Sequence, residues 1–280
     1  AGGHAYWCKC TPEEVEAVRE KARAEGKTPR YDGRCREMGL GPGPGHVVRL
    51  KAPQSGSVGF DDMVKGSIVF DASELDDMIL RRADGAPTYN LAVVVDDLAM
   101  GISHVLRGDD HVNNTPRQIL IYRALGAQQP VFGHVPMILG PDRQKLSKRH
   151  GAKAVIEYEK DGLLAEALVN YLVRLGWSHG DQEIFSMREL KDAFDGNNLN
   201  SAASAFDPEK LLWVNGQHMR SAEPEKLAGL LQPFLTAGGV PDDDKGLILR
   251  SIPLIQPRAS SLVEMAENLK PLLTPVARLA

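Results

Sequence analysis

The chain has 280 residues, a formal net charge of -4 and a pI of about 6.1, so it cannot coat nucleic acid by global charge. Its 42 % of hydrophobic residues suffice for one large domain or for two to three small ones. The longest apolar runs fall far short of the ~20 residues that span a bilayer, which excludes a membrane segment.

The first predicted element is a short helix that begins after Thr11. Thr11, Pro12 and Glu14 place an N-cap, a first-turn proline and a capping-box carboxylate in the order that starts a helix. The glycine-rich stretch 38–60 then reads as loop, with a short strand at residues 47–50. It is not a phosphate loop, because neither a strand before it nor a helix after it is evident.

Cys8 and Cys10 precede this helix and Cys35 follows it, so the thiols lie on two arms that flank one helix. Three cysteines are an odd and small number, which argues against a disulfide framework and for a reducing compartment, the cytoplasm. Metal binding is therefore the hypothesis to test, with three inert thiols as the alternative.

The middle of the chain alternates between the two kinds of element. The predicted order is a strand at 67–70, a helix from Ser73 to Arg82, a continuous apolar run at 91–95, a strand at 102–106, a helix at 114–126 and a strand at 131–139. This order predicts an α/β fold with a buried parallel sheet of the doubly wound type. In such sheets, ligands bind beyond the carboxyl ends of the strands.

From about residue 163 the pattern is helical. Helices are expected at 163–175, after Ser186 and Glu189, at 208–214, at 224–235 and within 242–280. We interpret Trp177 and Trp213 as core anchors, and His134 and His179 as structural residues, since these histidines have no metal partner at helical spacing.

The loop 140–151 follows the predicted strand 131–139 and carries a cluster of cations. At the carboxyl end of a sheet, Lys145, Lys148 and Arg149 could neutralise the charge that builds up on a triphosphate when a phosphoryl bond is attacked. A solvated basic loop is the alternative, because short basic strings are common.

Residues 145–149, Lys-Leu-Ser-Lys-Arg, resemble the second signature motif of class I aminoacyl-tRNA synthetases, and the following His-Gly-Ala is what the bacterial glutamyl type carries. Other blocks resemble that type in the same order, at residues 87–97, 105–111, 113–118, 171–181 and 206–215. Because the blocks cover about residues 1–220, the chain is identified as similar to bacterial-type glutamyl-tRNA synthetases.

The resemblance implies an enzyme that joins L-glutamate and ATP into glutamyl-adenylate, with Mg²⁺ assisting the nucleotide. The acyl group then passes to the terminal adenosine of tRNA(Glu). It further implies that Lys148 stabilises the transition-state phosphates and that Lys145 supports it. The implied ATP site comprises both lysines with Ser147, Arg149, Asp110 near the ribose and Ile138 at the adenine edge.

For glutamate, the resemblance assigns recognition of the amino acid to Arg107, and a guanidinium fork suits a side-chain carboxylate. Tyr89 occupies a second matching position, and Asn90 and Val93 would line the same pocket. The alternative for Arg107 is a surface cation. For Asp96, Asp97 and Asp109, loop or cap carboxylates are the alternative.

The cysteines resemble the family's zinc-binding insertion near the acceptor end of the tRNA, and thiolates suit tetrahedral zinc. Where the family has a histidine two residues after the third cysteine, this chain has Glu37. The expected ligands are Cys8, Cys10, Cys35 and Glu37, with Tyr31, His4 or water as alternatives to Glu37.

The resemblance also implies an organisation, summarised as α/β: the second half of a Rossmann-like catalytic domain with an insertion and a C-terminal all-α region. We expect an acceptor-binding insertion at 1–86, the half catalytic domain at 87–150, a helical stem-contact domain at 151–222 and the start of a helical anticodon-binding domain at 223–280. The earlier His-x-Gly-His signature is not present. We therefore expect an N- and C-terminally incomplete monomer that is inactive alone in adenylate formation.

Three other functions stay open. One is the glutamyl-queuosine-type paralogue, which glutamylates a modified tRNA base and ends before an anticodon domain. Glutaminyl-tRNA synthetase is a second, disfavoured by the cysteine arms. A non-catalytic tRNA-binding module is the third, and it predicts salt-dependent tRNA binding without aminoacylation.

Overall fold

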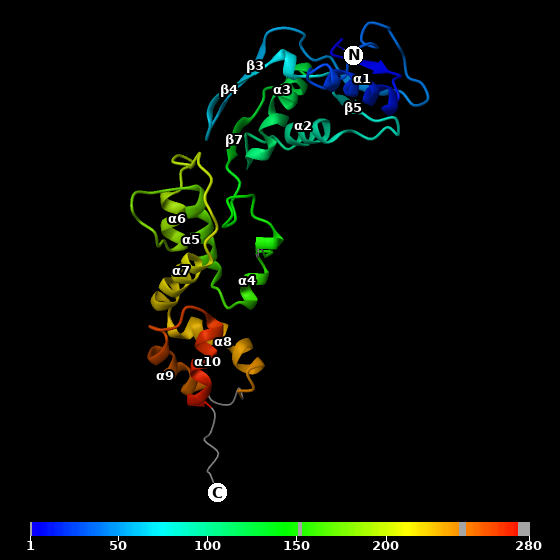
Figure 1. Cartoon of the computed structure of the whole chain (residues 1–280). Helices are drawn as coiled ribbons and strands as arrows, with labels where there is room; N and C mark the ends of the chain where they lie inside the picture. The colour runs from blue at the N-terminus through cyan, green and yellow to red at the C-terminus, as the bar shows by residue number, and fades with distance from the viewer. Residues whose placement is uncertain (1, 151–152, 241–244, 274–280) are drawn as a thin grey trace. The chain divides into compact units, whose positions relative to one another are not determined.

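The computed structural model describes residues 2–150, 153–240 and 245–273, and it divides into two compact units, Ala1–Val135 and Pro136–Ala280 (Figure 1). Parts of two expectations, the His-Gly-Ala segment at 150–152 and the helical stretch 242–280, lie outside the described residues. Within these residues, no helix is long and apolar enough to cross a membrane.

The first unit contains two sheets. One is antiparallel and joins β1 (Ala5–Cys8), β2 (Val47–Leu50) and β5 (Ile79–Arg81) in that order. The other is mixed, with the order β4-β3-β7-β6, and its strands are β3 (Ser57–Asp62), β4 (Gly66–Asp71), β6 (His104–Gly108) and β7 (Val131–Val135).

The fold is α/β as expected, but the larger sheet is mixed rather than parallel throughout. β7 runs parallel to β3 and to β6, but β3 and β4 are antiparallel. A connection of three residues joins β3 to β4, and such a short connection can only reverse the chain. Gly66, with φ of 74°, takes the left-handed conformation that this turn requires.

The helices of the first unit are α1 (Pro12–Ala24), α2 (Tyr89–Ala99) and α3 (Thr115–Ala124). The predicted capping box of α1 is confirmed: Glu14 N donates to Thr11 Oγ1 at 3.3 Å, and Thr11 N donates to Glu14 Oε2 at 2.9 Å. One core joins the mixed sheet with α2 and α3, and it includes Val58, Phe60, Val94, Ile119, Tyr122 and Phe132.

In this unit the apolar run 91–95 is helical, and the helix expected at 73–82 was wrong. The apolar run 91–95 lies on α2, where Val94 is buried and Val95 is 45 % exposed. A short apolar run fits a strand or a buried helix equally well, because its periodicity does not separate them. The helix expected at 73–82 is a single turn, η1 (Ala72–Glu74), followed by β5, whose pairing with β2 outweighs the local capping signal.

The expected domain boundaries also differ from the observed units. Residues 50–80 share their core with α2, α3 and β7, so 86/87 is not a boundary between compact parts. Residues 136–150, which carry the Lys-Leu-Ser-Lys-Arg loop, belong to the second unit rather than to the segment that begins at 87.

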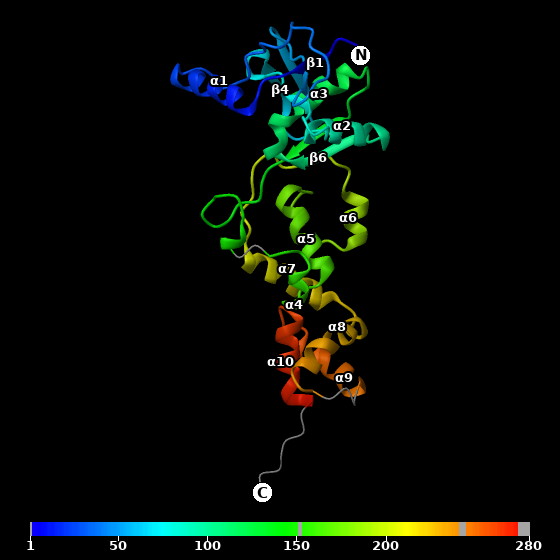
Figure 2. The ribbon, with the colours of Figure 1, turned by 90° about the vertical axis from the view of Figure 1, so that its right-hand side faces the viewer.

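The second unit is helical. Its elements are η3 (Lys148–His150), α4 (Glu157–Lys160), α5 (Ala165–Gly176), α6 (Met187–Ala193), α7 (Pro208–Ser221), α8 (Pro224–Ala237), α9 (Lys245–Ile255) and α10 (Leu262–Leu273). Figures 1 and 2 show α8, α9 and α10 side by side at the C-terminal end. Their core continues into α5 and α7, so 151–222 and 223–280 share buried residues.

The two tryptophans of this unit differ. Trp177 is 1 % exposed and packs against Phe185, as expected of a core anchor. Trp213 is 40 % exposed and lies under Lys210 Nζ, 3.8 Å from the ring centroid, so its interpretation as a core anchor was wrong. The buried face of α7 is instead formed by Leu211 and Val214.

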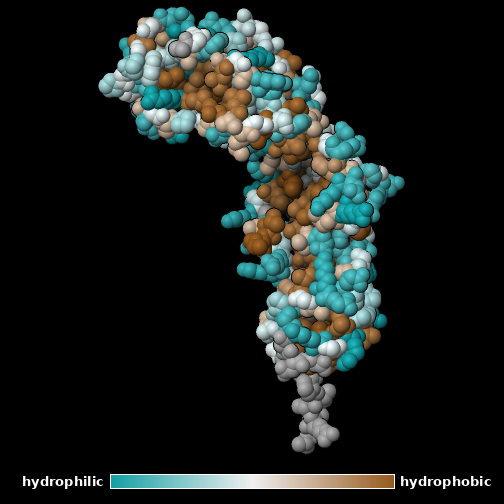
Figure 3. Space-filling view, turned by 180° about the vertical axis from the view of Figure 1, so that it is seen from behind, coloured by the Kyte–Doolittle hydropathy of each residue, from teal (hydrophilic) through white to brown (hydrophobic). Residues whose placement is uncertain are grey.

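Some hydrophobic side chains lie on the surface. Figure 3 shows hydrophobic areas on one face of each unit, bordered by hydrophilic residues. Ile156 and Leu254 are among the most exposed, at 70 % and 68 %. Contiguous exposed apolar areas are typical of surfaces that contact a partner.

Candidate functional site

Arg107 is the best-anchored of the predicted site residues. It lies on β6, opposite His134 of β7, and its Nε donates to His134 Nε2 at 3.1 Å. Its Nη2 donates to Thr115 Oγ1 at 2.8 Å and to Gln118 Oε1 at 2.9 Å. Gln118 Nε2 in turn donates to Asn90 Oδ1 at 3.1 Å, so the predicted residues Arg107 and Asn90 belong to one hydrogen-bond network.

The guanidinium is a partly desolvated cation. Burial lowers the pKa of Arg107, while the nearby Tyr89 and Asp97 oppose that shift. An arginine remains charged under these conditions, because its ordinary pKa exceeds 12. A half-buried, fixed guanidinium is suited to binding a carboxylate, and none of the three bonds above uses its Nη1.

Tyr89, Asn90 and Val93 lie on the first turns of α2. Tyr89 is 53 % exposed, and its ring centroid is 6.1 Å from that of His111. Tyr89 and Val93 are four residues apart and therefore share one face of the helix. The first unit thus holds the four residues predicted for glutamate: Arg107, Tyr89, Asn90 and Val93.

The carboxylates near the end of β6 have different surroundings. Asp110, predicted for ATP, lies in η2 (Asp109–Asn114), and its side chain is 47 % exposed. Asp109 Oδ2 forms an ion pair with Lys65 Nζ at 3.0 Å. Asp97 accepts a hydrogen bond from Tyr122 at 3.4 Å. Asp97 and Asp109 therefore each have a side-chain partner within the first unit.

The basic loop lies in the second unit and is shaped by backbone bonds. Leu146 N donates to Ile138 O at 2.9 Å, and Gly140 N donates to Gln144 O at 2.8 Å. Arg143 has φ of 59°, a left-handed conformation that closes the tight turn between them. Ile138 and the loop, both predicted for ATP, are thus brought together.

The cations of this loop face solvent. Lys145, Lys148 and Arg149 are exposed, Ser147 is half-buried, and Arg149 Nη2 lies 3.9 Å from Asp142 Oδ2. The backbone bonds hold the two ends of the loop in place, and its exposed cations can approach a polyphosphate without a large desolvation cost. The loop does not directly follow a strand, because β7 ends at Val135.

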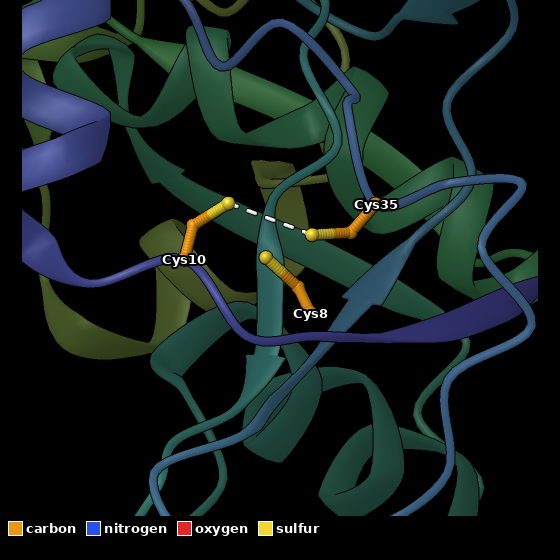
Figure 4. Close-up of side chains that lie close together, drawn as sticks. All are labelled: Cys8, Cys10 and Cys35. Carbon is orange, nitrogen blue, oxygen red and sulfur yellow. Dashed lines mark hydrogen bonds between the residues drawn. The ribbon is translucent and has the colours of Figure 1, made fainter.

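The three cysteines form a cluster. Cys8 ends β1, Cys10 follows two residues later, and Cys35 comes from the loop after α1; Figure 4 shows their sulfur atoms converging. The ligand atoms all lie within 4.8 Å of one another, and Cys10 Sγ is 3.5 Å from Cys35 Sγ. Tyr31 joins them: its hydroxyl is 3.3 Å from Cys8 Sγ and 3.7 Å from Cys10 Sγ.

These spacings suit tetrahedral zinc. Zinc–sulfur bonds of ~2.3 Å and zinc–oxygen bonds of ~2.0 Å place sulfur atoms roughly 3.8 Å apart and oxygen about 3.5 Å from sulfur. Burial, together with the thiols of Cys35 and Cys8, raises the pKa of Cys10 to about 12, against a lowering by Tyr31. For Cys8, burial acts in the same direction, but hydrogen bonds from Tyr31 and Arg49 lower its pKa overall.

Glu37, the expected fourth ligand, does not join the cluster. Its side chain is 82 % exposed, and its carboxylate lies 3.5 Å from Lys51 Nζ and 3.9 Å from Arg36 Nε. Among the described residues, the group of cysteine, histidine and acidic side chains at this site consists of the three cysteines. The Tyr31 hydroxyl, weighed in the sequence as an alternative, lies beside Cys8 Sγ and Cys10 Sγ and accepts a hydrogen bond from Cys35 N at 3.1 Å.

Sequence reasoning missed the residues that hold Arg107. Thr115 and Gln118 lie within the block 113–118 that carries part of the resemblance, so position alone could have suggested them. His134 was interpreted as structural, and it is buried, but it contacts a candidate binding residue directly. Asp62, which contacts His134, has no neighbouring motif that could have signalled it.

Comparison with known proteins identifies the class. The family model for the catalytic domain of class I tRNA synthetases (E and Q) matches residues 1–213, and the chain belongs to this family. A glutamate–tRNA ligase from Nitratidesulfovibrio vulgaris (strain DP4) is 64 % identical over 275 residues, which are 98 % of this chain and 59 % of that protein. One from Syntrophobacter fumaroxidans is 59 % identical over 269 residues, or 96 % of this chain and 58 % of that protein.

Solved structures agree. The crystal structure of a glutamate tRNA ligase from Elizabethkingia meningosepticum, in complex with its amino acid, has a TM-score of 0.84 at 29 % identity, covering 98 % of this chain and 61 % of that one. The chain thus spans about three fifths of the length of the curated relatives that it matches.

Proposed function

We propose that this chain carries residues for glutamate and ATP in a glutamate–tRNA ligase, an enzyme that attaches L-glutamate to tRNA(Glu) through glutamyl-adenylate. The observation that carries the proposal is the anchored guanidinium of Arg107, linked through Gln118 to Asn90. It gives the first unit a fixed cation at the end of β6.

Arg107 would bind the side-chain carboxylate of glutamate, with Tyr89 as a hydroxyl partner and with Asn90 and Val93 beside it. A fixed cation selects against glutamine, because the neutral amide would leave the guanidinium partly unpaired. This supports charging with glutamate rather than with its amide.

Lys148 and Lys145 would stabilise the negative charge that develops on the phosphates of ATP, and Ser147 and Arg149 would assist them. Asp110 would accept hydrogen bonds from the ribose, and Ile138 would offer backbone groups to the adenine edge. Mg²⁺ would share the charge of the nucleotide. Such reactions depend mainly on positioning and electrostatics, which suits a loop whose ends are held by backbone bonds and whose cations are exposed.

The cysteine cluster would hold Zn²⁺ through Cys8, Cys10, Cys35 and Tyr31. The support is the donor set: three thiols and one hydroxyl whose spacings are close to those of a tetrahedral site. Glu37 is replaced in this role because its carboxylate faces two cations instead.

For tRNA, we propose contacts with the acceptor end from residues 1–86, with the stem from 151–222 and with the anticodon side from 223–280. The helices α8, α9 and α10 support the synthetase over the glutamyl-queuosine-type paralogue, which ends before this region. A cytoplasmic location rests on the few free cysteines, and a monomer on the resemblance.

The direct test uses the complete gene product in glutamate-dependent exchange between ATP and pyrophosphate, followed by charging of tRNA(Glu). Exchange that needs glutamate and fails with glutamine is expected. Binding of tRNA that weakens with salt, without exchange or charging, would instead favour the non-catalytic module.

A further inference from the structure

Behind Arg107 lies a buried pair of polar side chains, Asp62 and His134. Both side chains are fully buried, and His134 Nδ1 lies 2.5 Å from Asp62 Oδ2. They come from neighbouring parallel strands, since Asp62 ends β3 and His134 is on β7. Buried polar side chains lower stability unless they are hydrogen-bonded, so the bonds of this pair indicate what it does.

The bonds of His134 define its protonation state. Arg107 Nε–H donates to His134 Nε2, and a guanidinium can only donate, so Nε2 must carry a lone pair. The proton of the neutral ring is then on Nδ1 and is donated to the Asp62 carboxylate. His134 therefore links an anion to a cation while remaining neutral.

Asp62 is itself fixed by the backbone. Its Oδ1 accepts from Val64 N and Lys65 N, each at 3.0 Å, and from His134 N at 3.1 Å. These donors belong to the β3–β4 turn and to β7, which are held by sheet pairing. The carboxylate that holds Nδ1 of the imidazole is thus fixed by main-chain atoms, and on the other side of the ring Nε2 also lies 3.0 Å from Thr115 Oγ1.

These bonds fix the orientation of the Arg107 guanidinium. His134 holds Nε, while Thr115 and Gln118 hold Nη2, and none of these three bonds uses Nη1. With two of its nitrogens held, the plane of the guanidinium cannot rotate about the side-chain axis. A cation held in one orientation before the ligand arrives costs less ordering entropy on binding and discriminates better between ligands.

We infer that Asp62 and His134 are positioning residues for Arg107, and that together they set the affinity and selectivity of the glutamate site. This inference rests on the proposed function, because it takes Arg107 as the residue that binds the glutamate side chain. Neither positioning residue needs to touch the substrate.

The test compares two substitutions of one residue in the complete gene product. His134→Gln can place an amide oxygen near the position of Nε2 and so keep an acceptor for Arg107. His134→Asn is shorter: it keeps a donor for Asp62 but loses that acceptor. We expect the KM for glutamate to rise about 10- to 100-fold for Asn and by less than about fivefold for Gln, with the KM for ATP nearly unchanged.

Asp62→Asn completes the set, and Asp77→Asn is its matched control. Both residues are 5 % exposed, and Asp77 accepts bonds from Tyr6, Arg36 and Ala52 N away from Arg107. Both variants should lower the melting temperature, but only Asp62→Asn should raise the KM for glutamate. If Asn and Gln at position 134 behave alike, or if Asp77→Asn raises that KM equally, the pair serves stability alone and the inference is wrong.

A second measurement separates this inference from the proposed function. Nitrogen-15 NMR of labelled histidine reports the tautomer of His134 without any substrate, and the Nδ1–H form is expected. A complete protein that shows this tautomer but no glutamate-dependent exchange would refute the proposed function alone. Exchange that is active with unchanged glutamate KM in His134→Asn would refute the positioning role alone.

Discussion

At the scale of single residues, the three directed hydrogen bonds of Arg107 matter more than its charge alone. Lysine would keep the charge but could not make separate bonds to His134, Thr115 and Gln118. We expect Arg107→Lys to reduce kcat/KM for glutamate by about 100-fold, or about 2.7 kcal/mol. The exposed Arg123→Lys, on α3 of the same unit, is the control and should change kcat/KM less than twofold in the same exchange assay.

His134 also makes stability depend on pH. Burial lowers its pKa, which outweighs the opposing effect of Asp62; Arg107 and Lys65 lower it further. An unfolded histidine has a pKa of about 6.5, so below that pH the unfolded state binds more protons than the folded state. The free energy of unfolding should therefore fall as pH drops from ~6.5 toward the lower folded pKa.

The slope contributed by one proton is at most about 1.4 kcal/mol per pH unit. Urea unfolding of the first unit between pH 7.5 and 5.5 would measure it, and His134→Gln should remove this share of the slope. Asp62 affects stability in a lower pH range. Burial raises its pKa, but hydrogen bonds from His134 and backbone amides lower it overall, so the contribution of Asp62 to the free energy of unfolding is lost only below about pH 4. If the free energy of unfolding of His134→Gln depended on pH as steeply as that of the unsubstituted protein, another group would be responsible for the slope.

The candidate binding residues could be predicted from the sequence, but the residues that hold Arg107 in position could not. Arg107 and Tyr89 lie within compact motifs, whereas Asp62 and His134 are 72 residues apart and meet only through the pairing of β3 and β7. Glu37 illustrates the opposite error. It is spaced like a ligand, but its carboxylate lies beside Lys51 and Arg36 rather than beside the thiols.

At the scale of elements, capping signals located helix starts but not helix lengths, and apolar runs did not reveal the type of element. The capping boxes of α1 and α6 fix both helix starts through bonds within four residues. The run 91–95 became a helix because one face packs in the core while the other is exposed, and composition does not encode that difference. Similarly, β5 depends on its pairing with β2, a strand about 30 residues away in the sequence.

On the proposal that the cysteine cluster holds Zn²⁺, its ligands can be distinguished by substitution. Tyr31→Phe removes the proposed fourth ligand atom, so zinc affinity should fall by about 10- to 100-fold. Glu37→Gln should leave zinc affinity unchanged, because Glu37 faces Lys51. Competition with a chromophoric chelator measures both variants, and the reverse order of effects would return Glu37 to the ligand set.

At the scale of the whole molecule, each unit has its own core. The core of the first unit joins the mixed sheet to α2 and α3, and the core of the second joins α5, α7 and the helices α8 to α10. Units with separate cores can unfold in separate steps, so a single free energy of unfolding would then not describe the chain.

A substitution buried in one core should therefore reveal the division. Leu227 of α8 is fully buried, and Leu227→Ala should lower the stability of the second unit by about 2–5 kcal/mol through the cavity that it leaves. Hydrogen exchange should become faster in α8 to α10, while the amides of β3 and β7 keep their protection. Exposed Leu230→Ala, on the same helix, is the matched control and should change little. Equal loss of protection in β3 and β7 would mean that the two cores unfold as one cooperative body, and the pH dependence expected from His134 would then belong to the whole chain.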